Sequence, residues 1–492
     1  MSDSSNASNT PSQPDLKSLE ALYHEAEYWH VNTGDKTIHA KRMPGTFRRI
    51  KWMTMSVWLI FFLGPYLRWN GQQAVLFDIP ARQFHIFNIT ILPQDVWMLA
   101  LVMLFFALLL AAVTSIAGRV FCGYFCFQTV WTDIFVWIEE KLEGPPARRV
   151  KLDAEPWSLH KLRIKFVKHS LWLAIGLLTG ISFTLWFGDA FELWKDYLTL
   201  QAPLFAWGTV GVFVFFTHLF AGHMREQVCF WLCPYARIQG VMYDRETILP
   251  TYDFGRGEPR GKLKKGSRTE GGEQGDCIDC KQCVAVCPTG IDIRTGQQEG
   301  CITCALCLDA CDAVMDKVHR PHGLIRYASL DEVEGKPTLK LYQRPRVVVY
   351  FAIMLAALGG IFYGLTNLGA LELKALHERQ PLFVRLSDGS IQNKYVLKIL
   401  NKTEADRQVT LSVHGHAAVQ LVNAEKTLTA RQGGVTAHTI FLRIAPGELT
   451  AERIPLSLRI EDTSNPEYAA EYNTMFFGPP PSPASTANGD SR

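Results

Sequence analysis

The hydrophobic residues of this chain are concentrated in long runs that carry almost no charge. Runs of about 17 to 25 such residues can cross a bilayer core of about 30 Å. Five runs therefore predict transmembrane helices, at about 52–67, 96–117, 171–187, 202–221 and 347–371. The first run is short, so Arg68 at its end must extend toward the lipid headgroups.

Beyond the fifth run the pattern changes to strict alternation. Apolar residues alternate with polar ones at positions 409–413 and again at 454–460, which is typical of half-buried strands. Turn signals such as "SDGS", "RQGG" and "APGE" separate the strands. We expect an immunoglobulin-like β-sandwich over 372–478. It contains no cluster of metal ligands or catalytic residues, which favours a docking or structural role.

Three segments have the composition of disordered or flexible chain. Residues 1–40 begin with a stretch rich in Ser, Asn, Pro and Gln, and contain no signal peptide. Residues 254–275 are rich in Gly and basic residues, which predicts a flexible linker. Residues 479–492 form a polar tail rich in Pro and Ser, which we expect to be disordered.

The charges predict an orientation. Basic residues precede the first helix and fill the loop between the second and third, whereas the other loops of the first four helices carry few. The positive-inside rule then places the N-terminus in the cytoplasm and, after five crossings, the C-terminal domain outside. The formal net charge is only +3, from 50 basic and 47 acidic residues, and gives no reason to expect nucleic acid as a partner.

All twelve cysteines lie between Cys122 and Cys311, on or near the predicted cytoplasmic side. Their spacings of two or three residues are too tight for a disulfide framework and suit metal ligation in a reducing compartment.

The strongest motif is a doubled C-x₂-C-x₂-C-x₃-C run, "CIDCKQCVAVCP" followed by "CITCALCLDAC". In two-cluster ferredoxins each run supplies three ligands to one cluster and its fourth cysteine to the other. This rule predicts two [4Fe–4S] clusters in an α+β ferredoxin-like domain within 251–345. The ligands of the first would be Cys277, Cys280, Cys283 and Cys311. Those of the second would be Cys301, Cys304, Cys307 and Cys287. The alternatives are structural zinc or disulfides.

Two C-x₃-C pairs follow the second and fourth predicted helices, in "RVFCGYFCFQTVW" and "EQVCFWLCPYARIQG". Residues four apart share a helix face, so Cys122 with Cys126, and Cys229 with Cys233, would each present two thiols together. Such pairs could bind Cu(I) or cycle between dithiol and disulfide, and the two pairs could converge as a four-thiol site. The alternative is that they are buried, unreactive cysteines.

The histidines give a weaker signal. His218, within the fourth predicted helix, is a candidate metal ligand, and His223 lies near it. We find no partner histidine at matching depth in another predicted helix, so a bis-histidine haem is not expected. His160 and His169 are expected at the membrane interface.

The order of these features resembles the CcoG/FixG/RdxA family of accessory proteins of cbb(3)-type cytochrome c oxidase. The stretches "LFDIPARQFHIFNITILPQD", "CGYFCFQTVWTD", "YDFGRGEPRG" and "CPTGIDIRTG" carry the resemblance, which covers about 41–477. One departure is that Phe127, and not proline, follows Cys126, whereas Pro234 follows Cys233. This departure puts the role of the first pair in doubt.

The resemblance implies a multi-pass protein of the bacterial inner membrane that reduces Cu(II) to Cu(I) before copper insertion into the oxidase. Its partners would be the lipid bilayer, copper ions or a copper chaperone, oxidase subunits or their assembly factors, and an unidentified cytoplasmic electron donor. Copper would be bound transiently. Two other functions stay open, a quinol-linked electron relay to a periplasmic reductase and a non-catalytic assembly scaffold.

Overall fold

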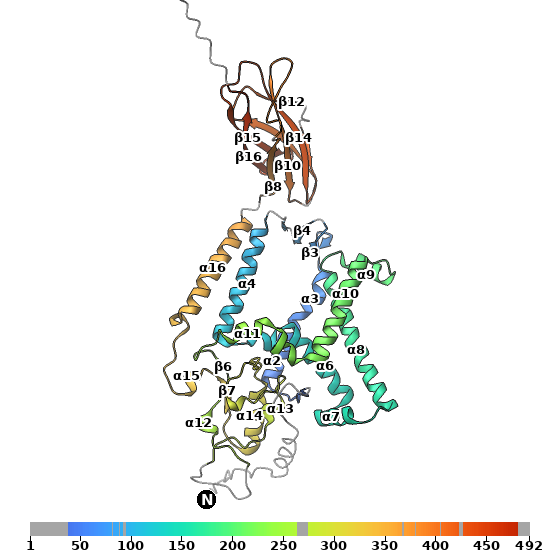
Figure 1. Cartoon of the computed structure of the whole chain (residues 1–492), viewed down its shortest axis with the longest axis vertical. Helices are drawn as coiled ribbons and strands as arrows, with labels where there is room; N and C mark the ends of the chain where they lie inside the picture. Colours follow the sequence, from blue (N-terminus) through green and yellow to red (C-terminus); the bar gives the residue numbers. More distant parts are fainter. Residues whose placement is uncertain are drawn as a thin grey trace, which may run out of the picture. The chain divides into compact units, whose positions relative to one another are not determined.

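A computed structural model of the chain describes residues 38–480 apart from 81, 88, 92–94, 263–273, 367–368, 379, 404 and 423–426. Most of the two predicted disordered ends lies outside the described residues. The chain divides into two compact units, which are treated separately below. The first comprises Met1–Arg68 and Leu99–Gly359, and the second Trp69–Met98 and Gly360–Arg492. Figure 1 shows the helices and strands of both.

Five helices of the described chain are long and apolar enough to cross a membrane, as predicted (Figure 1). They are α4 (Val96–Ala117), α5 with α6 (Val120–Tyr124 and Phe127–Glu143), α8 (Leu159–Thr184), α10 with the π-helix η4 (Leu204–Thr217 and His218–Met224) and α16 (Pro345–Thr366). Shorter helices connect them: α7 (Pro146–Ala154), α9 (Ala190–Leu198), a second π-helix η5 (Val228–Leu232) and α11 (Pro234–Gly240).

The number of apolar helices agrees with the prediction, but one of the five is a different segment of the chain. The segment predicted as the first span is helical from α2 (Thr46–Met55) to α3 (Leu59–Leu63), with 3₁₀ turns at Ser56–Trp58 and Gly64–Tyr66. These turns leave it without a single helix of spanning length, so its role as a span stays a prediction. The additional long helix is α6, which the sequence pattern predicts as a loop.

Helix α6 is amphipathic, which explains both its stability and why it was missed. Val130, Trp131 and Phe135 recur at helical spacing and are almost fully buried. Asp133 and Glu139 interrupt the uncharged run, so the prediction passed over this segment, although its mean hydropathy is high enough for a span. Both carboxylates are buried and paired with cations, as described below.

The cysteine-rich segment forms a small α+β domain. A two-stranded antiparallel sheet pairs β6 (Leu249–Tyr252) with β7 (Ile325–Ala328). The helices are α12 (Phe254–Gly257), α13 (Gln282–Ala285), α14 (Leu306–Val318) and α15 (Leu330–Val333), with 3₁₀ turns at Ile293–Thr295 and Leu341–Gln343. The predicted flexible linker is partly ordered, because the Gly275 N–H donates to Pro259 at 3.0 Å and the Arg256 guanidinium pairs with Asp276 at 2.5 Å. The remainder of that linker, 263–273, lies outside the described residues.

The second unit contains the predicted β-sandwich. One sheet has the order β12–β14–β10–β8 with β9 beside β10, and the other the order β13–β11–β15–β16. Its strands are β8 (Leu371–His377), β9 (Val384–Arg385), β10 (Ile391–Asn401), β11 (Arg407–His414), β12 (Val419–Val422), β13 (Thr427–Ala430), β14 (Val435–Ile444), β15 (Arg453–Asp462) and β16 (Ala469–Phe477). Antiparallel register sets Ile399 opposite Leu373, and Leu411 opposite Ile460. Alternate residues of both sheets face one apolar core, which confirms the alternation seen in the sequence.

A segment from between the first helices joins this second unit. Its strands are β1 (Arg68–Trp69), β2 (Gln72–Gln73), β3 (Val75–Asp78), β4 (Gln83–Ile86) and β5 (Ile89–Ile91). The ammonium group of Lys402 lies 3.0 Å from Asp95 and 2.5 Å from Glu372. Residues 69–98, which include the connection between the first two predicted spans, therefore belong to the same compact unit as the sandwich.

Candidate metal centres

Eight cysteines of the α+β domain gather into two groups of four thiols, identified by their mutual electrostatic interactions. The first thiol quartet comprises Cys277, Cys280, Cys283 and Cys311. The second thiol quartet comprises Cys287, Cys301, Cys304 and Cys307. All are free of disulfides. The structure thus brings together the same two sets that the spacing predicts, each with one cysteine from the other run.

The two runs fold around their quartets in the same way. In the first run the residues on either side of the second cysteine, Asp279 and Lys281, have φ of 53° and 51°. In the second run the matching residues, Thr303 and Ala305, have φ of 57° and 58°. Left-handed residues of this kind allow successive backbone N–H groups to form a concavity for an anionic group, as at many iron–sulfur sites.

The surroundings of the sulfurs fit a tetrathiolate metal centre. The Gln282 N–H donates to the Cys280 sulfur, and the Leu306 N–H donates to the Cys304 sulfur at the matching place. Burial raises the pKa of the Cys280 thiol to about 11, and burial raises that of Cys301 to about 12. Such thiols keep their protons at neutral pH unless a metal cation replaces them.

The second quartet lies between the first quartet and the long helices. Its Cys307 thiol interacts electrostatically with the Cys283 thiol of the first quartet. Its Cys304 packs in a hydrophobic cluster with Cys122 and Cys126 from the α5–α6 region. The cysteines therefore form a series from the first quartet through the second to the helices.

The remaining four cysteines also converge. We call Cys122, Cys126, Cys229 and Cys233 the membrane thiols. The Cys122 thiol interacts electrostatically with the other three and donates to Gln239 Oε1 at 3.3 Å. The two C-x₃-C pairs thus come together, an arrangement that the matching spacing left open.

Neither pair of membrane thiols lies on one regular helix, contrary to our expectation. Cys122 belongs to α5, but Cys126 has an extended ψ of 128° and precedes α6. Cys229 lies in the π-helix η5, and Cys233 has a ψ of 107° and precedes α11. The second thiol of each pair therefore stands at a break between two helices.

The two breaks have the same hydrogen bonding although only one contains proline. The N–H of Cys126 donates to the carbonyl oxygen five residues before it at 2.9 Å, and that of Cys233 does so at 2.8 Å. A helix then starts at Phe127 in one case and at Pro234 in the other. The absence of proline after Cys126 thus leaves the backbone geometry of the first pair intact.

The segment between the first two membrane thiols contacts the second quartet directly. A Cβ placed on Gly123 would lie 2.5 Å from the carbonyl oxygen of Ile302 and 3.1 Å from the backbone nitrogen of Cys304. The hydroxyl of Tyr124 donates to the carbonyl oxygen of Cys304 at 3.1 Å. Only a glycine allows so close an approach of the two backbones.

Arg119 places a fixed positive charge beside the membrane thiols and beside the second quartet. It is 4% exposed, and its guanidinium interacts electrostatically with Cys122, Cys229 and Cys301. A cation near several thiols favours their thiolate forms. Sequence analysis did not single out this residue, although its place three residues before Cys122 was a usable signal.

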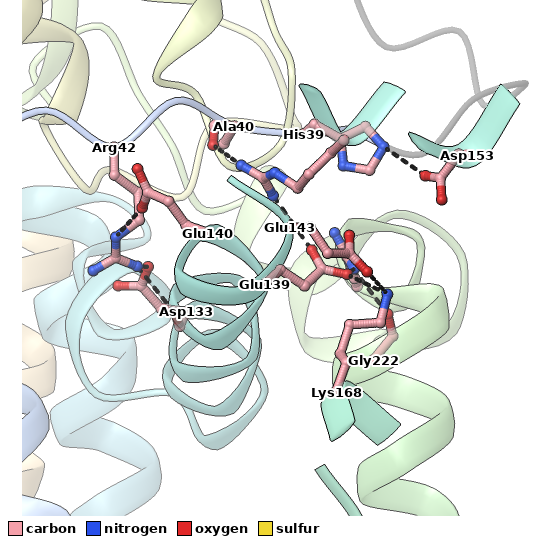
Figure 2. A network of polar contacts seen from close by, with 12 residues as sticks. His39, Ala40, Arg42, Asp133, Glu139, Glu140, Glu143, Asp153, Lys168 and Gly222 are labelled. Atoms are coloured by element: carbon pink, nitrogen blue, oxygen red, sulfur yellow. Dashed lines mark hydrogen bonds and ion pairs between the residues drawn. The ribbon is translucent and has the colours of Figure 1, made fainter. Parts of the chain in front are cut away.

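Buried ion pairs hold helix α6 among its neighbours, and part of this network is drawn in Figure 2. Asp133 pairs at 2.8–3.2 Å with three cations: Arg42, Arg48 and Lys51. Glu139 pairs at 2.6–3.3 Å with three more: Arg149, Lys168 and Arg225. Three of the basic residues before the first predicted span, Arg42, Arg48 and Lys51, therefore pair with α6 and are not simple flanking charges.

Three histidines meet at the junction of α8 and η4, contrary to the expectation that His218 has no partner histidine in another helix. The ring of His169 lies 5.2 Å from that of His218 and 5.8 Å from that of His223. His218 thus has histidine neighbours, and one of them is on another helix. The prediction failed because α8 begins at Leu159, about three turns before the apolar run, so His169 lies inside the helix.

Comparison with known families agrees with this architecture. A family model described as a 4Fe-4S dicluster domain matches residues 224–330, which contain both thiol quartets. A second, described as a 4Fe-4S binding domain, matches residues 99–145. A third, the IG-like fold at the C-terminus of FixG, matches residues 361–479 and thus the sandwich.

The chain is also similar to curated proteins over most of its length. Nitrogen fixation protein FixG from Rhizobium meliloti is 40% identical, with 89% of this chain and 93% of that protein covered. Protein RdxB from Cereibacter sphaeroides is 41% identical, with 90% and 96% covered. A crystal structure of a FixG-related protein from Vibrio parahaemolyticus matches 22% of this chain and 97% of that chain, at 24% identity and a TM-score of 0.21. The chain therefore belongs to the FixG/RdxA family of membrane iron–sulfur proteins.

Proposed function

We propose that this protein conducts electrons to the membrane thiols and there reduces Cu(II) to Cu(I), for the assembly of a cbb(3)-type cytochrome c oxidase. The observation that carries the proposal is the contact of Gly123 and Tyr124 with the Cys304 loop. It joins the segment of the first two membrane thiols, Cys122 and Cys126, directly to the second quartet. A redox centre at the second quartet would thus lie next to a soft four-thiol site.

The two quartets are the proposed ligands of two [4Fe–4S] clusters. When bound, such clusters supply one-electron reducing power at low potential. The chain's contribution is to fix their order, because Cys283 and Cys307 adjoin across the two quartets. Buried Arg294, beside Cys283, and Arg119, beside Cys301, each place a positive charge near one quartet.

Copper is the proposed substrate at the membrane thiols. A Cu(II) ion takes up one electron, and the Cu(I) product is soft, so thiolates retain it better than oxygen ligands do. A cavity beside Cys229 is lined by Asp133 and Glu226, and also by the basic residues Arg42, Arg48, Lys51 and Arg225. Within the described chain, Glu226 Oε2 is buried without a hydrogen-bond partner.

The proposal includes a topology. The N-terminus and all three thiol sites would be on or near the cytoplasmic side of the inner membrane, and the sandwich would be periplasmic. A cytoplasmic low-potential reductant would supply the electrons, and free copper or a copper chaperone the ion. Oxidase subunits or their assembly factors would dock on the sandwich.

A single-turnover experiment tests the proposal. The purified protein is reduced without oxygen, freed of reductant and mixed with Cu(II), and Cu(I) is captured by a coloured chelator. In the Cys229→Ser/Cys233→Ser variant we expect Cu(I) to form more slowly, because two soft ligands are lost. The iron content should stay at about eight atoms per chain, since no quartet is touched.

Two outcomes would contradict the proposal. Unchanged copper reduction in the double variant would show that the membrane thiols are not the site. A loss of iron would show that these thiols bind an iron–sulfur centre of their own.

A quinol-linked relay is the second candidate function. The match of a 4Fe-4S binding model to residues 99–145, where Cys122 and Cys126 are the only cysteines, supports an electron-transfer role for these thiols and names no electron donor or acceptor. A protein that oxidises quinol faster than it reduces Cu(II) would support this candidate instead.

A further inference from the structure

The histidines at the junction of α8 and η4 have the geometry of a ligand set. His169, His218 and His223 each offer one ring nitrogen, and these three nitrogens lie within 4.8 Å of one another. A metal ion with metal–nitrogen bonds of about 2.0 Å holds its ligand atoms about 3.4 Å apart. Because the His223 side chain is exposed, a small rotation of its ring can complete the site.

The π-helix is what brings two of these histidines together. In an α-helix, residues five apart differ by about 140° around the axis and face different ways. The wider π-helical turn over His218–Met224 brings the rings of His218 and His223 to a centroid distance of 5.0 Å. Single π-helical turns inside α-helices occur frequently at functional sites.

Close packing fixes this arrangement. A Cβ on Gly222 would lie 2.9 Å from the ring of Trp172, so a larger residue would push the two elements apart. The Trp172 ring is 2% exposed and lies 5.1 Å from the ring of His169. The histidine rings therefore pack against the buried Trp172 side chain, and the close contact at Gly222 fixes their positions.

Hydrogen bonding leaves ring nitrogens available to a ligand. Nδ1 of His223 lies 3.3 Å from the His218 carbonyl oxygen, which can hold the Nδ1–H tautomer and leave Nε2 free. Nδ1 of His169 and of His218 is buried, and neither has a hydrogen-bond partner in the described chain. Buried polar atoms normally have partners, so these two indicate a missing ligand.

The local charges permit a cation. Lys168 and Arg225 lie over the Trp172 ring, and Lys165 also interacts electrostatically with His169. Lys168 and Arg225 pair with Glu139 at 3.2 and 2.6 Å, and Lys168 also pairs with Glu143 at 2.8 Å. Lys165 pairs with Glu143 at 2.9 Å and with Asp153 at 2.6 Å. The carboxylates offset much of the positive charge that would otherwise repel a metal ion.

The site is also accessible. A pocket lined by the polar residues His39, Glu139, Asp153, Lys165 and Lys168 reaches His169 and His223. An apolar groove along α8 and α10 ends at His218 and His223 from the other direction. An ion can therefore approach through the polar pocket, while the groove keeps one side of the site apolar.

We propose that His169, His218 and His223 form a binding site for a divalent first-row transition-metal ion, with Cu²⁺ bound most tightly. Imidazole nitrogens suit Cu²⁺, Zn²⁺ and Ni²⁺, and affinity in this series peaks at copper. The site is separate from the membrane thiols and does not depend on the reduction of copper.

The test uses full-length protein with Cys122→Ser, Cys126→Ser, Cys229→Ser and Cys233→Ser, which removes the competing membrane thiols. One equivalent of Cu²⁺ is added to the oxidised protein, and paramagnetic resonance reports the ligands. We expect nitrogen hyperfine structure from imidazoles. His218→Asn/His223→Asn should abolish that structure and weaken Cu²⁺ binding at least about tenfold. His169→Asn, a single change on the other helix, should also weaken binding if the double variant fails to fold.

His160→Asn is the matched control, because His160 is an exposed histidine of the same helix α8. It should leave both the spectrum and the affinity unchanged, and iron content and thermal unfolding verify the fold of every variant. Cu²⁺ binding that is equally tight and nitrogen-ligated without His169, or without His218 and His223, would overturn the inference. Because no electron transfer is measured, this result is independent of the proposed copper reduction.

Discussion

Single residues set the distance between the membrane thiols and the second quartet. Gly123 faces backbone atoms of Ile302 and Cys304 that cannot move aside as a flexible side chain would. We expect Gly123→Ala to destabilise the fold by about 1–3 kcal/mol through overpacking and to slow copper reduction by moving α5 away. Chemical unfolding and the single-turnover assay measure the two effects.

Gly208 supplies the control for that substitution. It lies in helix α10, and a Cβ placed on it would have nothing within 4 Å, so Gly208→Ala should be neutral or slightly stabilising. If Gly123→Ala behaved like Gly208→Ala in both assays, the close contact with the Cys304 loop would matter neither for stability nor for electron transfer.

His39 gives the protein a pH-dependent stability. Burial, and then the guanidinium groups of Arg149 and Arg225, lower its pKa from 6.5 to about 4. As the pH falls below 6.5 the unfolded chain binds the proton first, so stability should decrease between pH 6.5 and 4. The decrease amounts to at most about 3 kcal/mol for this group. His39→Gln should flatten the unfolding profile over that range, while His160→Gln should not. Parallel profiles for all three proteins would contradict the assignment.

The cysteines illustrate which site residues a sequence can reveal. Both quartets follow from the spacing of the two runs together with the rule that, in two-cluster ferredoxins, the fourth cysteine of each run belongs to the other cluster. The three-histidine cluster does not, since it depends on a π-helical turn and on the point where α8 begins. Arg119 was missed for a different reason: a lone arginine beside a span resembles a flanking charge, and two of its thiol partners, Cys229 and Cys301, are distant in sequence.

At the scale of elements, the breaks before α6 and α11 each place an extended cysteine before a new helix, although the helix starts at Phe127 in one case and at Pro234 in the other. Proline is favoured at the first position of a helix, where its missing N–H is not needed, and the extended residue before it suits proline as well. Cys126, with φ of −59° and ψ of 128°, already has such a conformation. The backbone at Phe127 should therefore accept proline.

The Phe127 ring must be considered separately, because it stacks on Trp131 with a centroid distance of 4.1 Å. We expect Phe127→Pro and Phe127→Ala to be destabilised to the same extent within about 1 kcal/mol, since both lose the ring and proline adds no strain. Thermal unfolding compares them. A much less stable proline variant would show that the two breaks are not equivalent.

The elements of the sandwich were easier to predict than helix α6. The alternation of apolar and polar residues in β11 and β15 directly indicates that each strand has one buried face and one exposed face. Helix α6 instead buries Asp133 and Glu139, whose cost is offset only by cations from distant segments. No local pattern predicts such compensation, so a search for uncharged runs passes over the helix, although its mean hydropathy is high enough for a span and Val130, Trp131 and Phe135 have helical periodicity.

At the scale of the whole molecule, the chain builds its second unit from two separate stretches, 69–98 and 360 onward. Lys402, 7% exposed, links the stretches by pairing with Asp95 and Glu372. Removing one partner of a buried ion pair is costly because the remaining charge loses its compensation. We expect Lys402→Met to destabilise the second unit by on the order of 3 kcal/mol.

The iron–sulfur chromophore and the far-ultraviolet signal of the sheets report the two units separately. Both quartets belong to the first unit. Lys402→Met should therefore lower the temperature at which the sheets unfold and leave unchanged the temperature at which the iron–sulfur chromophore bleaches. Lys394→Met is the matched control, since Lys394 pairs with Glu378 at an exposed site where such pairs contribute little. If both signals moved together in the Lys402 variant, the two units would unfold as one, and the sandwich would have to be treated as part of the machinery that keeps the clusters in place.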